Sequence, residues 1–185
     1  ACGNCAVRTD VLAQDVDVAR MMDEVWKVIA FGIGRANGER IDDHPVFKAI
    51  AESPVREQRA MLQQAVSQLG TVGSGNHYVD LFEDRADGHL WIGVHFGSRG
   101  LGHKTASGFL ALAAGKAWED RVDDSMDAPP TLIRVETPLG QDYLAAMEIA
   151  GQYAYAGRAW VVERVLRIIG AHETARVHNH HNFAW

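Results

Sequence analysis

HYVDLFEDRADGHLWIGVHF, residues 77–96, is the stretch that decides the fold of this chain. Apolar and polar residues alternate from His77 to Phe82 and again from Leu90 to Phe96, which is the period of a strand with one buried face. Residues 83–89 between the two runs are rich in turn formers. The stretch therefore predicts a β-hairpin.

Helices are predicted on both sides of the hairpin. Apolar residues recur at helical spacing over residues 15–31, and a Ser53-Pro54 pair typical of a helix start opens a second helix that runs to Leu69. Two more helices are predicted over residues 102–118 and 143–169, the last ending at a glycine.

Further strands are predicted over residues 6–12, 131–135 and 176–182, with loops over 32–43 and an acidic loop over 123–130. Helices and strands without a regular βαβ rhythm favour the α+β class. We find no repeat or linker, so residues 1–185 form a single domain. Because the chain starts at Ala1 and ends on an aromatic Trp185, we expect it to be part of a longer domain.

The composition of the chain excludes several classes of protein. The chain has 185 residues, 47% hydrophobic and 23% charged, with a formal net charge of -6. This excludes a disordered tail, a collagen-like fibre and a disulfide-stapled mini-protein. No apolar run approaches the ~20 residues that span a bilayer. The acidic balance disfavours a globally basic nucleic-acid binder and leaves room for a local basic patch.

Two glycine-containing turns flank the hairpin. GTVGSGNH, residues 70–77, could cradle a phosphate with exposed backbone N–H groups, although a dinucleotide loop is excluded because a strand follows it. HFGSRGLG, residues 95–102, places Ser98 and Arg99 where a strand gives way to a helix, which suits a phosphate or a carboxylate. The alternatives are an ordinary hairpin lead-in with a buried His77 and a turn with a solvated arginine.

Four potential metal ligands lie at the ends of separate predicted elements: Cys2, His77, His95 and His181. Thiolate and imidazole groups from dispersed positions suit Zn, Mn, Fe or Co. For the last strand the alternative is simply a polar strand end. Cys2-x-x-Cys5, without a second pair, is weak support for a zinc ribbon or a redox pair. These residues indicate a metal and phosphate site of unspecified chemistry.

Five motifs follow one another along the chain: Ala1-Cys2-Gly3-Asn4, Gly73-Ser74-Gly75-Asn76-His77, His95-x-Gly97-Ser98-Arg99-Gly100-Leu101-Gly102, Tyr153-Ala154-Tyr155-Ala156-x-Arg158 and His180-His181-Asn182. In this order they resemble the RtcB family of RNA ligases over essentially the whole chain, and the ordered set is specific where each motif alone is not. The resemblance implies mixed or antiparallel β-sheets with flanking helices, an RtcB-like fold of which this chain is a truncated, N-terminal and central portion.

The resemblance also implies a reaction. Members of this family join RNA 2′,3′-cyclic phosphate or 3′-phosphate ends to 5′-hydroxyl ends in tRNA splicing and RNA repair. They use GTP and two Mn²⁺ ions, for which Zn²⁺ or Co²⁺ could substitute. A histidine becomes guanylylated, GMP passes to the RNA 3′-phosphate, and the 5′-hydroxyl then displaces it.

By motif match, the resemblance implies that Cys2 bridges the two Mn²⁺ ions and that His77, His95 and His181 complete the ligand set. It implies that Ser98 and Arg99 hold an RNA or nucleotide phosphate. The residues implied to line the GTP/GMP site are Asn76, His77, Tyr78, Val79, Asp80, His181 and Asn182.

Four departures limit this transfer. A family Asp ligand lies three residues before the position of Cys2, earlier than this chain begins. Asp80 stands where the family usually has Glu, and Cys5 occupies a variable position and is expected to be a spectator. The guanylylated histidine is expected beyond Trp185, so this chain contains no catalytic nucleophile and should be inactive alone.

Local positive charge is also required, because RNA affinity depends on phosphate contacts. We therefore expect Arg99, Lys104, Arg158 and Arg176 to gather around the site.

Two other functions remain open: a non-catalytic metal- or nucleotide-binding module, and a metal-dependent phosphoesterase. The expected partners are GTP, RNA, and either a second copy of the chain or an accessory activating protein, with no membrane. Two cysteines and nothing resembling a signal peptide predict a cytoplasmic location.

Overall fold

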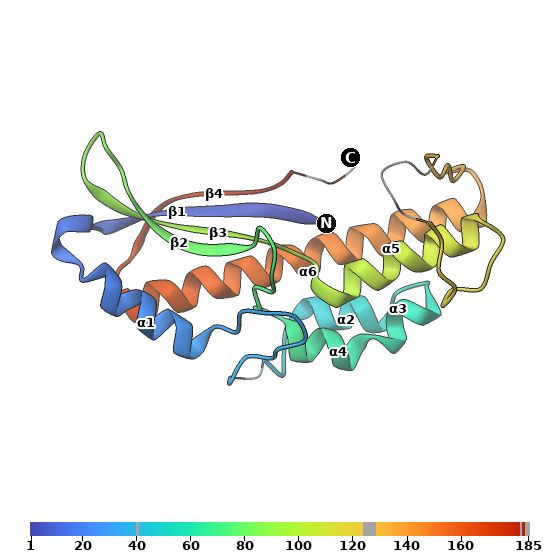
Figure 1. Cartoon of the computed structure of the whole chain (residues 1–185), viewed down its shortest axis with the longest axis horizontal. Helices are drawn as coiled ribbons and strands as arrows, with labels where there is room; N and C mark the ends of the chain where they lie inside the picture. Colours follow the sequence, from blue (N-terminus) through green and yellow to red (C-terminus); the bar gives the residue numbers. More distant parts are fainter. Residues whose placement is uncertain (40, 124–128, 182, 184–185) are drawn as a thin grey trace.

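The computed structural model describes residues 1–39, 41–123, 129–181 and 183. It is α+β, as predicted, with one antiparallel four-stranded sheet in the order β2-β3-β1-β4 (Figure 1). The elements in chain order are β1 (Cys2–Leu12), the 3₁₀ turn η1 (Ala13–Asp15), α1 (Val18–Val28), α2 (Pro45–Ala51), α3 (Arg56–Ala60), α4 (Leu62–Gln68), β2 (Tyr78–Glu83), β3 (His89–Gly97), α5 (Arg99–Ala113), α6 (Pro138–Ile169) and β4 (Glu173–His180).

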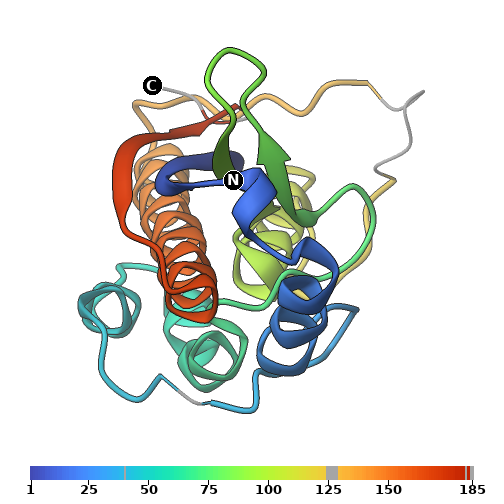
Figure 2. The ribbon, with the colours of Figure 1, turned by 90° about the vertical axis from the view of Figure 1, so that its left-hand side faces the viewer.

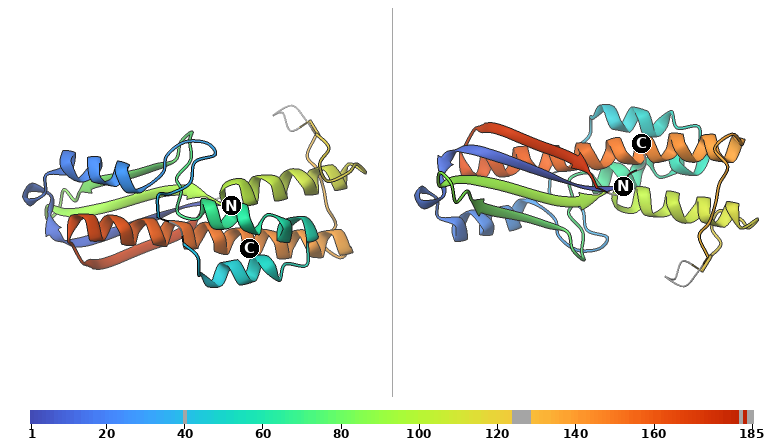
Figure 3. Two further views of the ribbon diagram at one scale, coloured as in Figure 1. Left: turned by 90° about the horizontal axis from the view of Figure 1, so that it is seen from below. Right: turned by 90° about the horizontal axis from the view of Figure 1, so that it is seen from above.

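The two faces of the sheet have different surroundings. Helices α1 and α6 cover one face, here called the inner face, as the end-on view in Figure 2 shows. Alternate residues of β1, among them Cys5 and Val7, turn inward into one core with Val161 and Val165 of α6. Seen from above (Figure 3, right), no described helix crosses the opposite, outer face.

Helix α6 is the longest element, with 32 residues. The hydroxyl of Thr137 accepts a hydrogen bond from the Gly140 amide at its start, and Gly170 ends it in the left-handed conformation, with φ 77°. One half of α6 supports the sheet, and the other half packs against α2, α4 and α5 (Figure 1).

The hairpin prediction is confirmed, since β2 and β3 pair antiparallel from Tyr78–His95 to Glu83–Leu90. The long C-terminal helix and the last strand are also confirmed, although α6 begins at Pro138 instead of residue 143 and β4 spans Glu173–His180 instead of 176–182. Asn182 lies outside the described residues. β1 is longer than predicted because it is paired on both sides.

Three local predictions are wrong. Residues 131–135 form no strand: Leu132 is exposed, and Arg134 instead accepts hydrogen bonds from Thr137 at the start of α6. The helix predicted from Ser53 begins only at Arg56, because the Ser53 hydroxyl binds the Val55 amide in a turn. It is then broken at Met61 into α3 and α4.

One helix was not predicted, and the bounds of another differ from the prediction. Helix α2 was missed, although His44 caps it and Pro45 occupies its first turn, a recognisable start signal. Helix α5 runs from Arg99 to Ala113 instead of 102–118. The predicted acidic loop falls partly on residues 124–128, outside the described residues. In the described part of the chain, none of the helices has the length and apolarity that crossing a membrane requires.

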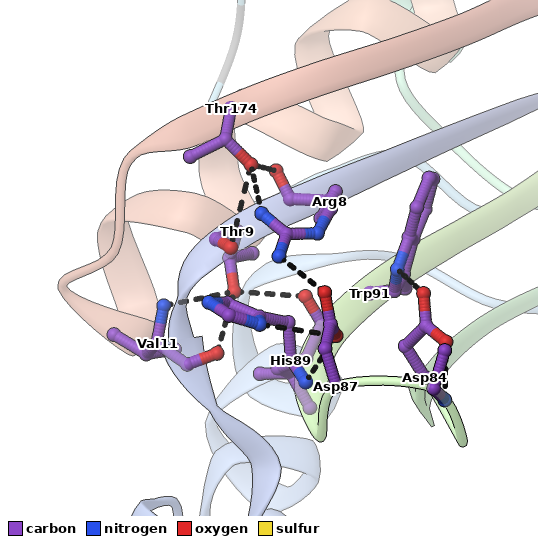
Figure 4. Close-up of polar contacts among 10 residues, drawn as sticks. Arg8, Thr9, Val11, Asp84, Asp87, His89, Trp91 and Thr174 are labelled. Carbon is purple, nitrogen blue, oxygen red and sulfur yellow. Dashed lines mark hydrogen bonds and ion pairs between the residues drawn. The ribbon is translucent and has the colours of Figure 1, made fainter.

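Arg8 joins the far end of the sheet to the hairpin turn (Figure 4). From β1, its guanidinium donates to Asp87 Oδ2 at 2.6 Å and to the Thr174 hydroxyl at 3.1 Å. The Arg8 hydrogen bond, together with bonds from His89, lowers the pKa of Asp87 from 3.8 to about 2. One side chain thus links β1, β4 and the turn between β2 and β3.

We predict that Asp87→Asn lowers the melting temperature at neutral pH, and that this deficit disappears in acid. Because the folded-state pKa of Asp87 is depressed, its stabilisation is present above about pH 4 and is lost as the pH falls towards 2. Thermal unfolding of both proteins between pH 2 and pH 7 measures this. The control is Asp43→Asn, which removes an exposed loop carboxylate outside the sheet. A pH-independent deficit for Asp87→Asn would contradict the prediction.

Candidate metal centre at one end of the sheet

The four predicted metal ligands lie at the same end of the sheet. Cys2 begins β1 and His77 immediately precedes β2, whereas His95 is near the end of β3 and His181 directly follows β4. Because neighbouring strands run antiparallel, the starts of two strands and the ends of the other two meet at the same end of the sheet. The sheet topology therefore gathers residues that are far apart in sequence.

The side chains of Cys2, His95 and His181 are close enough to share one cation, and His77 lies beside Cys2. Cys2 Sγ lies 3.4 Å from His95 Nε2 and 4.0 Å from His77 Nε2. The ligand atoms of Cys2, His95 and His181 lie within 4.8 Å of one another. The imidazoles of His95 and His181 stack with their centroids 5.1 Å apart.

The hydrogen bonds of two histidines orient their rings for metal binding. His95 Nδ1 is 2.7 Å from Asn4 Oδ1, and His77 Nδ1 is 2.8 Å from the Val72 carbonyl. Oxygen acceptors at these positions place the hydrogen on Nδ1. The Nε2 lone pairs of both rings are then left to face Cys2, which is the usual arrangement of metal-bound histidine.

Burial sets the charge states that the site has before a cation binds. Desolvation lowers the pKa of His95, with the neighbouring His181 and His77 adding to the effect, and it lowers the pKa of His77. Desolvation also raises the pKa of the Cys2 thiol. Neutral imidazoles are the form that binds metal, whereas the Cys2 thiol would lose its proton to solvent on binding a cation as thiolate.

The donor set fits a divalent cation. Bond lengths of about 2.3 Å to sulfur and 2.1 Å to nitrogen put neighbouring tetrahedral ligands about 3.6 Å apart. The separations of 3.4 Å and 4.0 Å around Cys2 bracket that value. One thiolate with several imidazoles is a set that binds Zn, Mn, Fe or Co rather than Mg or Ca.

Arg99 brings the two predicted phosphate-binding turns together. It has φ 51°, the left-handed region that is uncommon outside glycine, and its guanidinium packs against Gly73, which has φ 87°. Its Nε donates to the Thr71 hydroxyl at 3.2 Å, and its Nη1 lies 3.5 Å from His77 Nδ1. A side chain at Gly73 would collide with the guanidinium, so the glycine permits this approach.

The other predicted site residues differ in their exposure. Ser98 is buried and bonded through its amide to the Ala1 carbonyl. Tyr78 stacks on His95 with centroids 5.4 Å apart, and Asp80 is exposed on the same strand face. Asn76 is exposed in the loop, whereas Val79 is 3% exposed in the core, so only its backbone could contact a ligand. Asn182 lies outside the described residues.

The expected ring of basic residues does not form. Arg158 is fully buried on the inner side of the sheet. Lys104 donates to Gln64 of α4, and Arg176 pairs with Glu173 on its own strand. Of the four predicted cations, Arg99 lies beside a candidate ligand, with its Nη1 3.5 Å from His77 Nδ1.

Asn4 is the functional residue for which the sequence reasoning assigned no role. It lies two positions after Cys2 in β1, so strand alternation puts both side chains on the outer face. That spacing could have identified it as a hydrogen-bond partner of a ligand. Cys5, by contrast, points into the core on the other face, which agrees with a spectator and prevents a disulfide with Cys2.

We predict that Asn4→Leu weakens binding of Zn²⁺ or Mn²⁺ by about 10–100-fold, because His95 loses the acceptor that orients its ring. Isothermal titration calorimetry measures the affinity. The control is Asn179→Leu, which makes the same change at the position opposite Asn4 in β4 and should bind metal like the unmodified chain. Equal affinity for Asn4→Leu and the unmodified chain would contradict this role.

Comparisons with known proteins show the family to which the chain belongs. A family model described as tRNA-splicing ligase RtcB matches residues 48–185. RNA-splicing ligase RtcB homolog 2 of Entamoeba dispar is 33% identical over 86% of this chain and 38% of its own length. The tRNA-splicing ligase RtcB of Archaeoglobus fulgidus is 24% identical over 93% of this chain and 45% of its own length. The corresponding protein of Pyrococcus furiosus is 27% identical, over 89% and 21%.

The chain thus spans less than half the length of each of these relatives. The family match itself covers well over half of the chain, including His77, His95 and His181. The chain therefore belongs to the RtcB family of tRNA-splicing ligases.

Proposed function

We propose that this chain supplies the Mn²⁺ centre and part of the guanine-nucleotide site of a GTP-dependent RNA ligase. The reaction would join 2′,3′-cyclic phosphate or 3′-phosphate RNA ends to 5′-hydroxyl ends. The observation that carries the proposal is the convergence of Cys2, His77, His95 and His181 from four elements, with two of the rings oriented by hydrogen bonds.

A divalent cation held by these residues would neutralise phosphate charge and polarise the phosphoryl group under attack. The chain's own contribution is to position what binds beside it. Arg99 adjoins His77, so its guanidinium can contact a phosphate close to the cation. This local charge supports RNA or nucleotide binding in a chain whose net charge is -6.

The proposed nucleotide contacts come from the start of β2. Tyr78 and Asp80 share the outer strand face with the ligand His95, and Asn76 precedes them in the glycine-containing loop. Asp80 offers a carboxylate that can accept hydrogen bonds from a guanine ring. The side chain of Val79 has no part in this proposal because it is in the core.

We propose further that the guanylylated histidine comes from polypeptide outside these 185 residues, so that the chain alone binds metal without forming a covalent adduct. In support, Cys2, His95 and His181 lie together as a candidate metal cluster with His77 beside Cys2, so the proposal assigns these histidines to metal binding. We also propose a cytoplasmic location, because Cys2 and Cys5 lie on opposite faces of β1 and cannot form a disulfide with each other.

Native mass spectrometry with Mn²⁺ and GTP, repeated after denaturation, tests this proposal. We expect the unmodified chain to bind metal and to carry no covalent GMP. His95→Ala and His181→Ala should lose the metal, whereas His172→Ala, an exposed histidine at the opposite end of β4, should retain it. A GMP adduct that survives denaturation, or a ligated RNA product from this chain alone, would contradict the assignment of the nucleophile.

Assays on the same purified chain distinguish the ligase from the two alternative functions, a phosphoesterase and a non-catalytic binding module. Hydrolysis of a 2′,3′-cyclic phosphate without GTP, abolished by His95→Ala, would favour a metal-dependent phosphoesterase. A stable complex with a second polypeptide that restores ligation would identify the chain as a binding module that is completed in trans.

A further inference from the structure

Arg158 is a buried cation that the proposed function does not use. It lies in α6 within the Tyr-Ala-Tyr-Ala-x-Arg motif, and its side chain is 0% exposed. Burying a guanidinium costs free energy unless its donors are bonded. The contacts of Arg158 show what this side chain is arranged to hold.

Its guanidinium reaches three strands. Nη1 donates to the Phe96 carbonyl of β3 at 2.8 Å, and Nε donates to His178 Nε2 of β4 at 3.1 Å. Nη2 approaches β1 so closely that a Cβ atom on Gly3 would lie 3.0 Å from it. Phe96 follows His95, Gly3 follows Cys2, and β4 leads directly to His181.

A second side chain fixes His178 in the same position. The Tyr155 hydroxyl donates to the His178 carbonyl at 2.7 Å, and the two rings stack at 4.0 Å. The Arg158 guanidinium lies 5.0 Å from the centre of the Tyr155 ring, within the range of a cation–π contact. We call Tyr155, Arg158 and His178 the inner cluster.

The protonation state of His178 agrees with this role. Burial and then the charge of Arg158 lower its pKa to about 3. The ring is therefore neutral at physiological pH, and its Nε2 lone pair accepts from a guanidinium that remains protonated.

We propose that Arg158 is a positioning residue for the metal centre, holding the strands that carry Cys2, His95 and His181 at fixed separations from the opposite face of the sheet. The inference rests on the metal centre proposed above. Its contacts with β3 and β1 fall on Phe96 and Gly3, each next to a proposed metal ligand in sequence, and its contact with β4 falls on His178, three residues before His181. Because Arg158 extends from α6 on the inner face, it does not compete for the cation.

General packing does not explain this arrangement well. In the described part of the chain Nη2 has no hydrogen-bond acceptor, although it is buried. A long apolar side chain would fill the same space without that penalty. An apolar side chain could not donate hydrogen bonds to β3 and β4 at the same time, as Arg158 does while it contacts β1.

The test compares Arg158→Met with Arg164→Met in the full chain. Arg164 is on the same helix, mostly buried, pairs with Glu39 and lies over Trp160, so its replacement removes a similar cation without touching β3 or β4. Co²⁺ titration gives the affinity, and the thiolate-to-cobalt charge-transfer band reports the Cys2 bond. Amide hydrogen exchange over residues 94–97 and 177–181, measured without metal, reports how firmly these strand ends are held.

We expect Arg158→Met to bind Co²⁺ at least tenfold more weakly, with a weaker charge-transfer band per bound ion and faster exchange in both segments. Arg164→Met should lower the melting temperature and change none of the three. If Arg158→Met does not fold, Arg158→Lys is the second variant to test. One ammonium group cannot hydrogen-bond to β3 and β4 in the same geometry, so the affinity for Co²⁺ should again fall in a folded protein.

A folded Arg158 variant with unchanged affinity, band and exchange would overturn the positioning role while leaving the metal centre intact. Losses in Arg164→Met equal to those in Arg158→Met would also overturn it, because general destabilisation would then explain both. If the unmodified chain bound no Co²⁺, the metal centre itself would fail, and the inference would fail with it whatever the exchange data showed.

Discussion

The pairing of β1 with a strand on each side is the constraint on which the site depends. β1 places Cys2 opposite Gly97 of β3 and Gly3 opposite His180 of β4. A backbone hydrogen bond from His181 to the Cys2 carbonyl continues the ladder past the end of β4. A shift of one residue in either ladder would move the ligand side chains to the wrong face of the sheet.

The outer face of the sheet carries the proposed ligands, whereas the inner face packs against the helices. At one end of the sheet, the outer face carries the Cys2 thiol and the imidazoles of the proposed ligands, and Asn4 orients His95. The inner face is apolar over most of its length, which stabilises the sheet on α6. At the metal end that apolar layer is interrupted by Arg158 and His178, directly beneath the residues that precede or follow the ligands.

Much of the fold could be predicted from the sequence, because its strongest signals are local. The hairpin of β2 and β3 and the end of α6 at Gly170 follow from alternation, turn residues and a glycine cap. The strand predicted over 131–135 was wrong because a short apolar run carries no information on whether a pairing partner exists. Helix α2 was missed although its cap and proline were visible.

The site could be predicted only in part, for a different reason. Cys2 and His95 are 93 residues apart, and only strand pairing brings them together. Local patterns supply no such pairing, so the ordered motifs had to group the ligands. Arg158 was expected to gather with other basic residues around the site because RNA affinity depends on phosphate contacts, but its position on α6 turns it inward to the sheet.

X-ray absorption spectroscopy of the Zn²⁺-loaded chain tests the metal centre most directly. If Cys2, His77, His95 and His181 bind the ion, the first shell contains one sulfur at about 2.3 Å and imidazole nitrogens at about 2.0–2.1 Å. The outer-shell scattering of imidazole should also be present, and the sulfur contribution should vanish in Cys2→Ala. A shell of oxygen atoms only, or one unchanged by Cys2→Ala, would show that this end of the sheet is not a metal centre.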